Sequence, residues 1–310
     1  MIQLYDELII SSGGIKGISL IGALDQLSKN YPINKIKYYT GCSFGTVILL
    51  LLNINYSINE IKNIFLAINF GNFQEYKIIN FFEKCGLDEG LKFVDFLRAT
   101  MINKNYNYNI TFKELYDLTN KILTITVVNI TKGIVEYQNY ITTPNLSVIL
   151  SIRMSCGIPL LFSPILYNNF YYVDGGLLDP FPYFYHKNTK KIGLWLFDKC
   201  EFDFINNSCS KFITDLSDNF KYIIDLLRIL YSNYMKKYYK KIPENVIYIN
   251  HDINTNFGRF DISISDKLRM YNVGINKTNI FLKKLRKKRR NLYLLKKYFN
   301  YWSRETKVHS

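Results

Sequence analysis

The sequence lacks the patterns that mark secreted and membrane-spanning proteins. Its five cysteines include no C-x-x-C pair and no dense framework, which excludes a small scaffold built on disulfides. No apolar run reaches the length of a transmembrane helix, and the N-terminus is acidic where a secretory signal would be basic. We therefore expect a cytoplasmic protein whose closest contact with a membrane is peripheral.

Histidine and metal-ligand clusters are also scarce. The histidines are His186, His251 and His309, and no cluster of His, Cys and carboxylate residues has the spacing of a metal site. We therefore expect neither a metal nor an organic cofactor. Outside the basic C-terminal segment the sequence carries no nucleic-acid motif, so nucleic acid is not the expected partner.

The composition supports a large folded core and one localised charge feature. The 310 residues are 48% hydrophobic, which suffices for one large α/β domain or two smaller ones. The net charge is +15, but eleven Lys and Arg and one acid lie between Lys283 and Lys307, which leaves only +5 elsewhere. We divide the chain into a main domain, residues 1–275, and a basic tail, residues 276–310.

The most informative stretch is residues 41–45, Gly-Cys-Ser-Phe-Gly, a G-x-S-x-G pattern. The residues before it predict a strand and those after it a buried helix. Gly41 and Gly45 permit close backbone approach, and the helix N-terminus favours negative charge on the Ser43 oxygen. Ser43 is therefore a candidate nucleophile, and a glycine-rich turn with a solvated serine is the alternative.

A second glycine-rich turn, residues 13–17, lies between a predicted strand over 4–12 and a predicted helix that begins near Ile18. Two successive strand–turn–helix units predict a parallel sheet with both turns at its carboxyl edge. Backbone amides of Gly13 and Gly14 there could point at an oxyanion. A tight turn without a ligand is the alternative.

The third candidate is Asp174. An aromatic and β-branched strand over 170–173 ends at this aspartate, which is followed by Gly175 and Gly176. A carboxylate at a strand end can meet Ser43 at the edge of the sheet. An aspartate that only accepts hydrogen bonds from its own turn explains the pattern equally well.

A serine nucleophile needs a base. Ser43, an intervening aspartate and His251 follow the order of an α/β-hydrolase triad, but that fold places several strands before its serine, and only about 40 residues precede Ser43. His186 and His309 are more typical of surface or core histidines. The economical alternative is a Ser–Asp dyad, in which exclusion of water raises the pKa of the carboxylate.

Four ordered blocks resemble the patatin-like phospholipase family: residues 12–17, 41–45, 151–164 and 174–176. The resemblance covers about residues 5–200. It implies a three-layer α/β/α fold with a mainly parallel central sheet, and a lipid acyl hydrolase of phospholipase A type or a related kind. It also implies that Ser43 is the nucleophile and Asp174 its partner.

The same resemblance implies further site residues. The backbone N–H groups of Gly13, Gly14 and Ile15 would form an oxyanion hole. The motif glycines are Gly17, Gly41, Gly45, Gly175 and Gly176.

Two positions depart from the family pattern. Ser12 stands where the first glycine of three is usual, and Asp179 stands where asparagine is common. Neither change removes a catalytic atom, so we expect an active enzyme on phospholipid or another acyl lipid. The competing hypothesis is a lipid- or protein-binding module that kept the fold without turnover.

The basic tail carries an apolar stripe with Lys288 at one of its positions. We expect a helix that lies on a membrane surface, with aromatics at the interface and cations toward anionic head groups. A helix docked on the body and a nucleic-acid or nuclear-targeting segment at residues 287–290 are the alternatives. The stripe consists of Phe281, Leu285, Leu292, Leu295, Phe299 and Trp302.

Overall fold

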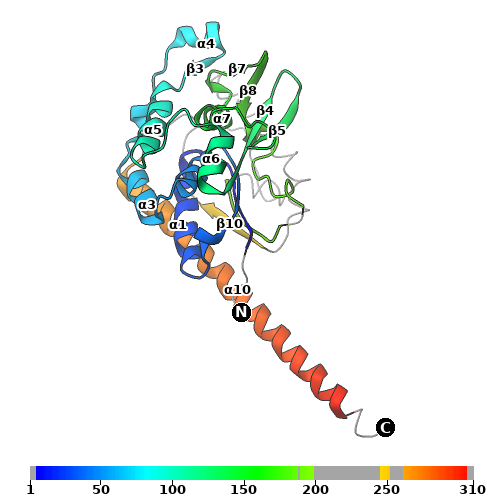
Figure 1. Cartoon of the computed structure of the whole chain (residues 1–310). Coiled ribbons are helices and arrows are strands. Elements are labelled where there is room, and N and C mark those ends of the chain that lie inside the picture. The colour runs from blue at the N-terminus through cyan, green and yellow to red at the C-terminus, as the bar shows by residue number, and fades with distance from the viewer. Residues whose placement is uncertain (1–4, 188, 199–244, 252–260, 306–310) are drawn as a thin grey trace.

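The computed structural model describes residues 5–187, 189–198, 245–251 and 261–305. These residues form an α/β fold around a mixed, mostly parallel sheet with helices packed on it (Figure 1). The strand order is β10-β9-β1-β2-β4-β8-β7, and β5 also pairs with β4. Strands β10 to β4 run parallel, whereas β5, β7 and β8 make antiparallel pairs. The predicted α/β class with a mainly parallel sheet is confirmed.

The parallel strands β1, β2 and β4 are largely buried, as continuous apolar runs predict, whereas β5 and β7 are mostly half-buried or exposed. The strand bounds are β1 Glu7–Ile10, β2 Tyr38–Cys42, β4 Ile122–Asn129, β5 Ile134–Gln138, β7 Ile165–Tyr167, β8 Phe170–Asp174, β9 Lys191–Asp198 and β10 Val246–His251. A separate two-stranded sheet pairs β3 Gly86–Asp88 with β6 Leu160–Phe162 in parallel.

Helix α2 is buried along its whole length, which explains why residues 47–52 contain no polar side chain. The α-helices of the described residues are α1 Ile18–Ser28, α2 Phe44–Asn53, α3 Ile58–Ala67, α4 Ile78–Lys84, α5 Leu91–Ile102, α6 Phe112–Thr119, α7 Val148–Ser155 and α10 Ile264–Glu305. Short 3-10 turns lie at η1 Gly14–Gly17, η2 Ile33–Lys35, η3 Phe70–Phe73 and η4 Gly175–Leu177.

Helix α10 is one element of 42 residues, so the expected boundary between residues 275 and 276 falls inside it rather than at its start. Its first half packs on α1 at very short range. A Cβ on Gly22 would lie 1.9 Å from the carbonyl oxygen of Tyr271, and one on Gly274 would lie 1.9 Å from that of Ser19. Because Leu282 is also buried, the first half of α10 belongs to the core.

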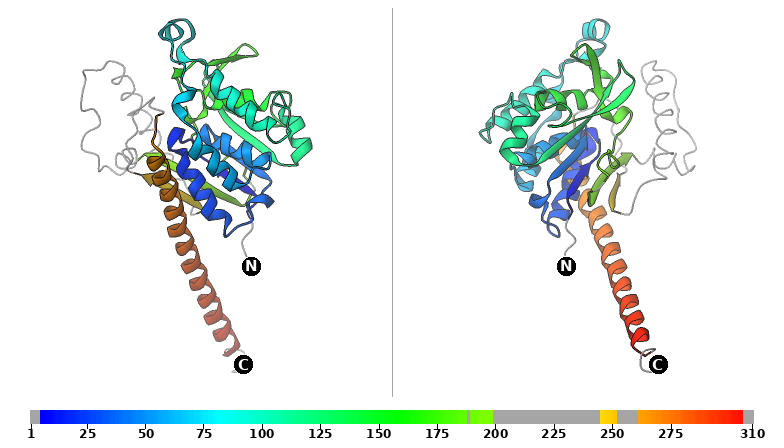
Figure 2. Two further views of the ribbon diagram at one scale, coloured as in Figure 1. Left: turned by 90° about the vertical axis from the view of Figure 1, so that its left-hand side faces the viewer. Right: turned by 45° about the vertical axis from the view of Figure 1, so that its right-hand side comes forward.

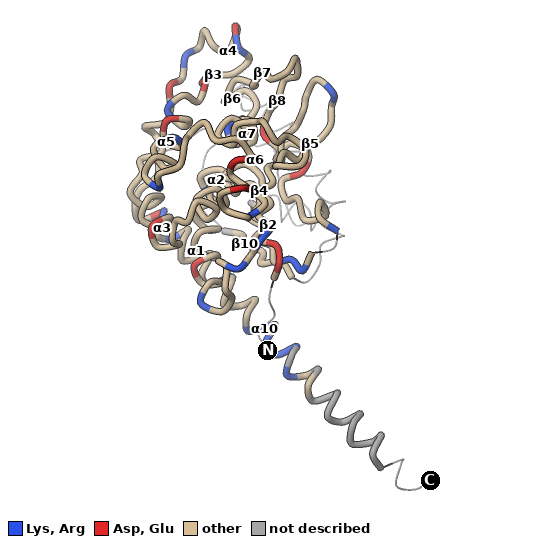
Figure 3. The backbone as a smooth tube through the Cα atoms, viewed as in Figure 1, with Lys and Arg blue, Asp and Glu red and all other residues tan. Residues whose placement is uncertain are grey.

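The second half of α10 extends away from the body (Figures 1 and 2), and the part next to the body is rich in Lys and Arg (Figure 3). Of the predicted stripe, Phe281 and Leu285 are half-buried and Lys288 is exposed. The side chains of the other four stripe residues lie outside the described part. Within that part, no helix combines the length and the apolar run needed to cross a bilayer.

Candidate active site

Ser43 occupies a sharp turn between β2 and α2, as the sequence predicts. Its backbone has φ 50° and ψ −128°, a combination that non-glycine residues rarely adopt and that is typical of functional turns. The turn lies directly against β1, since a Cβ on Gly45 would be 2.5 Å from the carbonyl oxygens of Ile10 and Ser11. The Ser43 residue is 4% exposed, so its hydroxyl is shielded from bulk water.

Asp174 ends β8 and reaches the same point. Its Oδ2 accepts a hydrogen bond from Ser43 Oγ at 2.7 Å, and its Oδ1 accepts one from the Gly176 N–H at 2.7 Å. Gly175 lets the turn pass close to β4, because a Cβ there would lie 2.3 Å from the carbonyl oxygen of Thr126. The structure thus brings together the two side chains that the sequence singled out.

The environment of Asp174 favours its neutral form. Burial raises the pKa of this carboxyl to about 6, and hydrogen bonds from Ser43, Gly176 and Cys42 oppose the rise without cancelling it. A carboxylate with a pKa near 6 can both accept and return a proton at neutral pH.

Ser155, at the end of α7, was not assigned a role from the sequence. Its Oγ accepts a hydrogen bond from the Ser43 backbone N–H at 2.8 Å and donates one to the carbonyl oxygen of Thr126 at 2.7 Å. The residue is fully buried. The only signal in the sequence was its position inside the block 151–164.

The loop of Gly13, Gly14 and Ile15 leads into η1. Gly14 has φ +48°, a left-handed conformation that favours glycine. No hydrogen bond between the described residues uses the backbone N–H of these three positions. Gly14 and Ile15 line the same cavity as Ser43. Gly17 packs beneath the Phe44 ring, where a Cβ would be 2.1 Å from a ring carbon.

The cavity next to Ser43 is almost entirely apolar. The empty space in it, including the solvent at its open side, is about 620 Å³. Sequence reasoning found little chemistry between residues 53 and 97, although aromatic richness in that segment was the available signal. Seven phenylalanines line the cavity: Phe44, Phe65, Phe70, Phe73, Phe93, Phe96 and Phe162.

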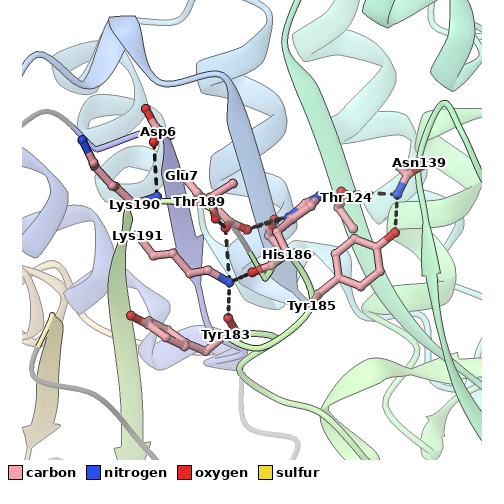
Figure 4. A network of polar contacts seen from close by, with 11 residues as sticks. Asp6, Glu7, Thr124, Asn139, Tyr183, Tyr185, His186, Thr189, Lys190 and Lys191 are labelled. Atoms are coloured by element: carbon pink, nitrogen blue, oxygen red, sulfur yellow. Dashed lines mark hydrogen bonds and ion pairs between the residues drawn. The ribbon is translucent and has the colours of Figure 1, made fainter.

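The histidines lie elsewhere. Nδ1 of His186 is 2.8 Å from Oε1 of Glu7 (Figure 4). Glu7 begins β1, whereas Ser43 follows the end of the parallel strand β2, so the two sites lie at opposite ends of these strands. His251 ends β10, and the strand order puts β9 and β1 between it and β2, a separation of about 14 Å at the usual strand spacing. His309 lies outside the described residues.

Among the described residues, no group of three or more His, Cys, Asp or Glu side chains is placed to hold a metal ion. The polar side chains around Ser43 are instead the Asp174 carboxylate and the Ser155 hydroxyl. This set of groups suits acyl transfer through a serine.

The family model described as patatin-like phospholipase matches residues 8–185, more than half of the chain. The chain belongs to the patatin-like phospholipase family. As a patatin-like phospholipase it is a lipid acyl hydrolase, which confirms the predicted family and enzyme class.

Several proteins resemble this patatin-like phospholipase along most of its length. A probable lipid hydrolase of Invertebrate iridescent virus 6 is 30% identical over 292 residues, which span 90% of this chain and 89% of that protein. An uncharacterised protein of Acanthamoeba polyphaga mimivirus is 27% identical over 278 residues, 87% of this chain and 91% of that protein.

Solved structures share the fold of this patatin-like phospholipase. VipD from Legionella pneumophila superposes with a TM-score of 0.58 at 17% identity, covering 91% of this chain and 67% of that one. The type III effector protein ExoU gives a TM-score of 0.50 at 12% identity, covering 91% of this chain and 53% of that one.

Proposed function

We propose that the enzyme hydrolyses the acyl ester of a phospholipid or related lipid through a Ser43–Asp174 dyad. Asp174 takes the hydroxyl proton as Ser43 Oγ attacks the ester carbonyl. The resulting tetrahedral intermediate expels the lipid alcohol, which receives that proton, and leaves an acyl-serine. A water molecule then attacks the acyl-serine with Asp174 again as the base, which releases the fatty acid and restores Ser43.

The single observation that carries this proposal is the hydrogen bond of 2.7 Å from Ser43 Oγ to Asp174 Oδ2 beside the cavity. The raised pKa of Asp174, about 6, supports its role as a base at neutral pH. His251 is a poor candidate, because two strands separate its backbone from β2.

The glycine-rich loop and the cavity supply the other two requirements of acyl transfer. Amides of Gly13, Gly14 and Ile15 would stabilise the negative charge on the carbonyl oxygen in the transition state. The phenylalanine-lined cavity would receive the acyl chain, since its walls match a hydrocarbon chain in polarity. Residues on both sides of Ser43 would thus orient the ester bond at the nucleophile.

Labelling with a fluorophosphonate tests the nucleophile. Wild-type protein should be labelled and should hydrolyse a short-chain ester, whereas Ser43→Ala should lose both. Asp174→Asn should lower turnover by at least ~10²-fold, the low end for a positioned base, and His251→Ala should change little. A strong loss with His251→Ala beside near-normal Asp174→Asn would falsify the dyad.

The same assays address the competing hypothesis of a binding module without turnover. Such a module would bind lipid vesicles normally while wild-type protein stayed unlabelled and released no fatty acid. Product analysis by lipid profiling, wild type against Ser43→Ala, would identify the acyl position and head group that the enzyme prefers.

A further inference from the structure

Helix α4 presents a row of large apolar side chains to solvent. Ile78 is 78% exposed, Ile79 is 54% exposed and Phe82 is 77% exposed. These are large apolar groups on a helix of only seven residues. Exposed apolar patches of this kind mark interaction sites.

Hydrogen bonds fix the residues just before and just after α4. The buried carboxylate of Asp88 accepts hydrogen bonds from the backbone N–H groups of Glu75 and Gly90, each at 2.6 Å. The buried guanidinium of Arg153 donates to the carbonyl oxygens of Glu89 at 3.0 Å and Ser163 at 3.0 Å. The segments on both sides of α4 are therefore anchored to the body of the protein.

The segment that carries α4 also forms a wall of the cavity at Ser43. It is preceded by η3, with Phe70 and Phe73, and followed by α5, with Phe93 and Phe96, and all four rings line the cavity. Through β3 it pairs with β6, whose Phe162 lines the cavity too. A surface that contacts α4 would therefore lie close to the cavity proposed for the acyl chain.

The position of α4 is opposite to that of the basic helix. In both views of Figure 2, as in Figure 1, α4 projects from one end of the molecule and the C-terminal half of α10 from the other.

The segment around α4 also differs from the basic helix in its charge. Residues 74–92 contain three lysines and four acidic residues, and Lys84–Glu89 and Lys92–Glu75 are ion pairs at 2.8 and 3.3 Å.

We propose that α4 inserts Ile78, Ile79 and Phe82 into a zwitterionic lipid surface and so places the cavity against the layer that supplies its acyl chain. Without a surplus of cations, the contact depends on apolar insertion rather than on anionic head groups. Three side chains on a short helix expose far less than the roughly 800 Å² per partner that a stable protein interface buries. A lipid surface needs no such area, because each apolar side chain inserts independently.

This inference rests on the proposed function, but its binding test does not need turnover. The triple variant Ile78→Gln, Ile79→Gln, Phe82→Gln is compared with a control that changes three other exposed apolar residues, Ile102→Gln, Leu118→Gln, Ile141→Gln. Flotation with phosphatidylcholine vesicles, in the Ser43→Ala background, should show at least tenfold weaker binding for the α4 variant. The control should bind within twofold of the parent, and 0.5 M NaCl should leave the parent's binding nearly unchanged.

Activity and fluorescence complete the test. With Ser43 present, the α4 variant should release fatty acid from the vesicles at least tenfold more slowly and hydrolyse a soluble short-chain ester at the wild-type rate. A tryptophan at position 82 (Phe82→Trp) should shift its emission to the blue on vesicles. Equal vesicle binding by the α4 variant and its parent would overturn the proposal, as would a wild-type dimer that the α4 variant dissociates. Failure of fluorophosphonate labelling would instead count against the proposed function.

Discussion

Ser155 Oγ lies 2.8 Å from the backbone nitrogen of Ser43 and 2.7 Å from the carbonyl oxygen of Thr126. One buried hydroxyl thus accepts a hydrogen bond from the turn that carries Ser43 and donates one to β4. The Ser43 amide is engaged by this bond, so the proposed oxyanion hole would use the amides of Gly13, Gly14 and Ile15 instead. We infer that Ser155 is a positioning residue for the turn that carries Ser43.

Ser155→Ala should remove the partner of a buried N–H group. The unsatisfied donor should destabilise the fold by about 1–3 kcal/mol and slow ester hydrolysis by about tenfold, since the Ser43 turn loses its tie to β4. Ser155→Thr keeps the hydroxyl and should recover most of the activity. The measurements are thermal unfolding and the rate of fluorophosphonate labelling. An alanine variant with the wild-type labelling rate would show that the bond serves stability alone.

The pH dependence of activity should follow Asp174. The carboxyl must be ionised to take the serine proton, and burial raises its pKa to about 6. Hydrolysis of a soluble ester should therefore fall about tenfold per pH unit below that value and level off above it. A profile without an inflection near 6 would argue against Asp174 as the base.

The same raised pKa predicts how stability depends on pH. Because the folded pKa exceeds the ordinary value of 3.8, the Asp174 contribution to stability is fully present below about 4 and is lost as the pH rises through about 6. Asp174→Asn should then be more stable than wild type at pH 8, by up to about 3 kcal/mol, and the difference should vanish at pH 4. Melting temperatures at the two pH values measure this.

A buried ionic cluster at the start of β1 should stabilise the fold without affecting ester hydrolysis. Glu7 is fully buried and accepts a hydrogen bond from Thr40. It also accepts one from His186, and the ammonium of Lys191 lies 3.6 Å away (Figure 4). Burial alone would raise the pKa of Glu7, but hydrogen bonds from His186, Thr189 and Thr40 hold it below its usual value. The stabilisation is therefore present at neutral pH and is lost as the pH falls through that lowered pKa.

Glu7→Gln would leave Lys191 buried without its counter-charge, which should cost about 3–5 kcal/mol of stability. Glu83→Gln, at an exposed carboxylate, is the matched control and should change stability little. Denaturant unfolding at pH 7 measures both variants. Activity on a soluble ester at low temperature should be unchanged in each, and a selective loss in Glu7→Gln would connect the cluster to the active site.

The predicted membrane contact of the basic tail needs a truncation that spares the core. Deletion of residues 289–310 keeps the buried Leu282 and the hydrogen bond from Arg286 to Asn30 and removes six cations and one acid. Binding to anionic vesicles should weaken, and added salt should weaken wild-type binding in the same direction. Hydrolysis of a soluble ester should be unaffected. Unchanged binding to anionic vesicles would indicate that the tail binds a partner other than the membrane.

Local sequence determined the elements and the candidate residues. The glycine-flanked turns, the strand that precedes Ser43 and the strand that ends at Asp174 follow from local propensity, because only short-range backbone geometry decides them. The order of these units along the chain was enough to predict a parallel sheet with the turns at one edge. Ser43 and Asp174 could therefore be named as candidates before their distance was known, and the resemblance to the patatin-like family gave each its predicted role.

Tertiary structure alone decided the contacts between distant segments. The hydroxyl of Ser155 meets the Ser43 amide across 112 residues, and such a pairing depends on how α7 packs on β4 rather than on any local pattern. The same holds for Gly22 and Gly274, which let α1 and α10 pack closely, so that the start of the expected tail, up to the buried Leu282, belongs to the core. The cavity and the exposed face of α4 likewise depend on packing, because the type of an apolar residue does not determine whether its side chain is buried.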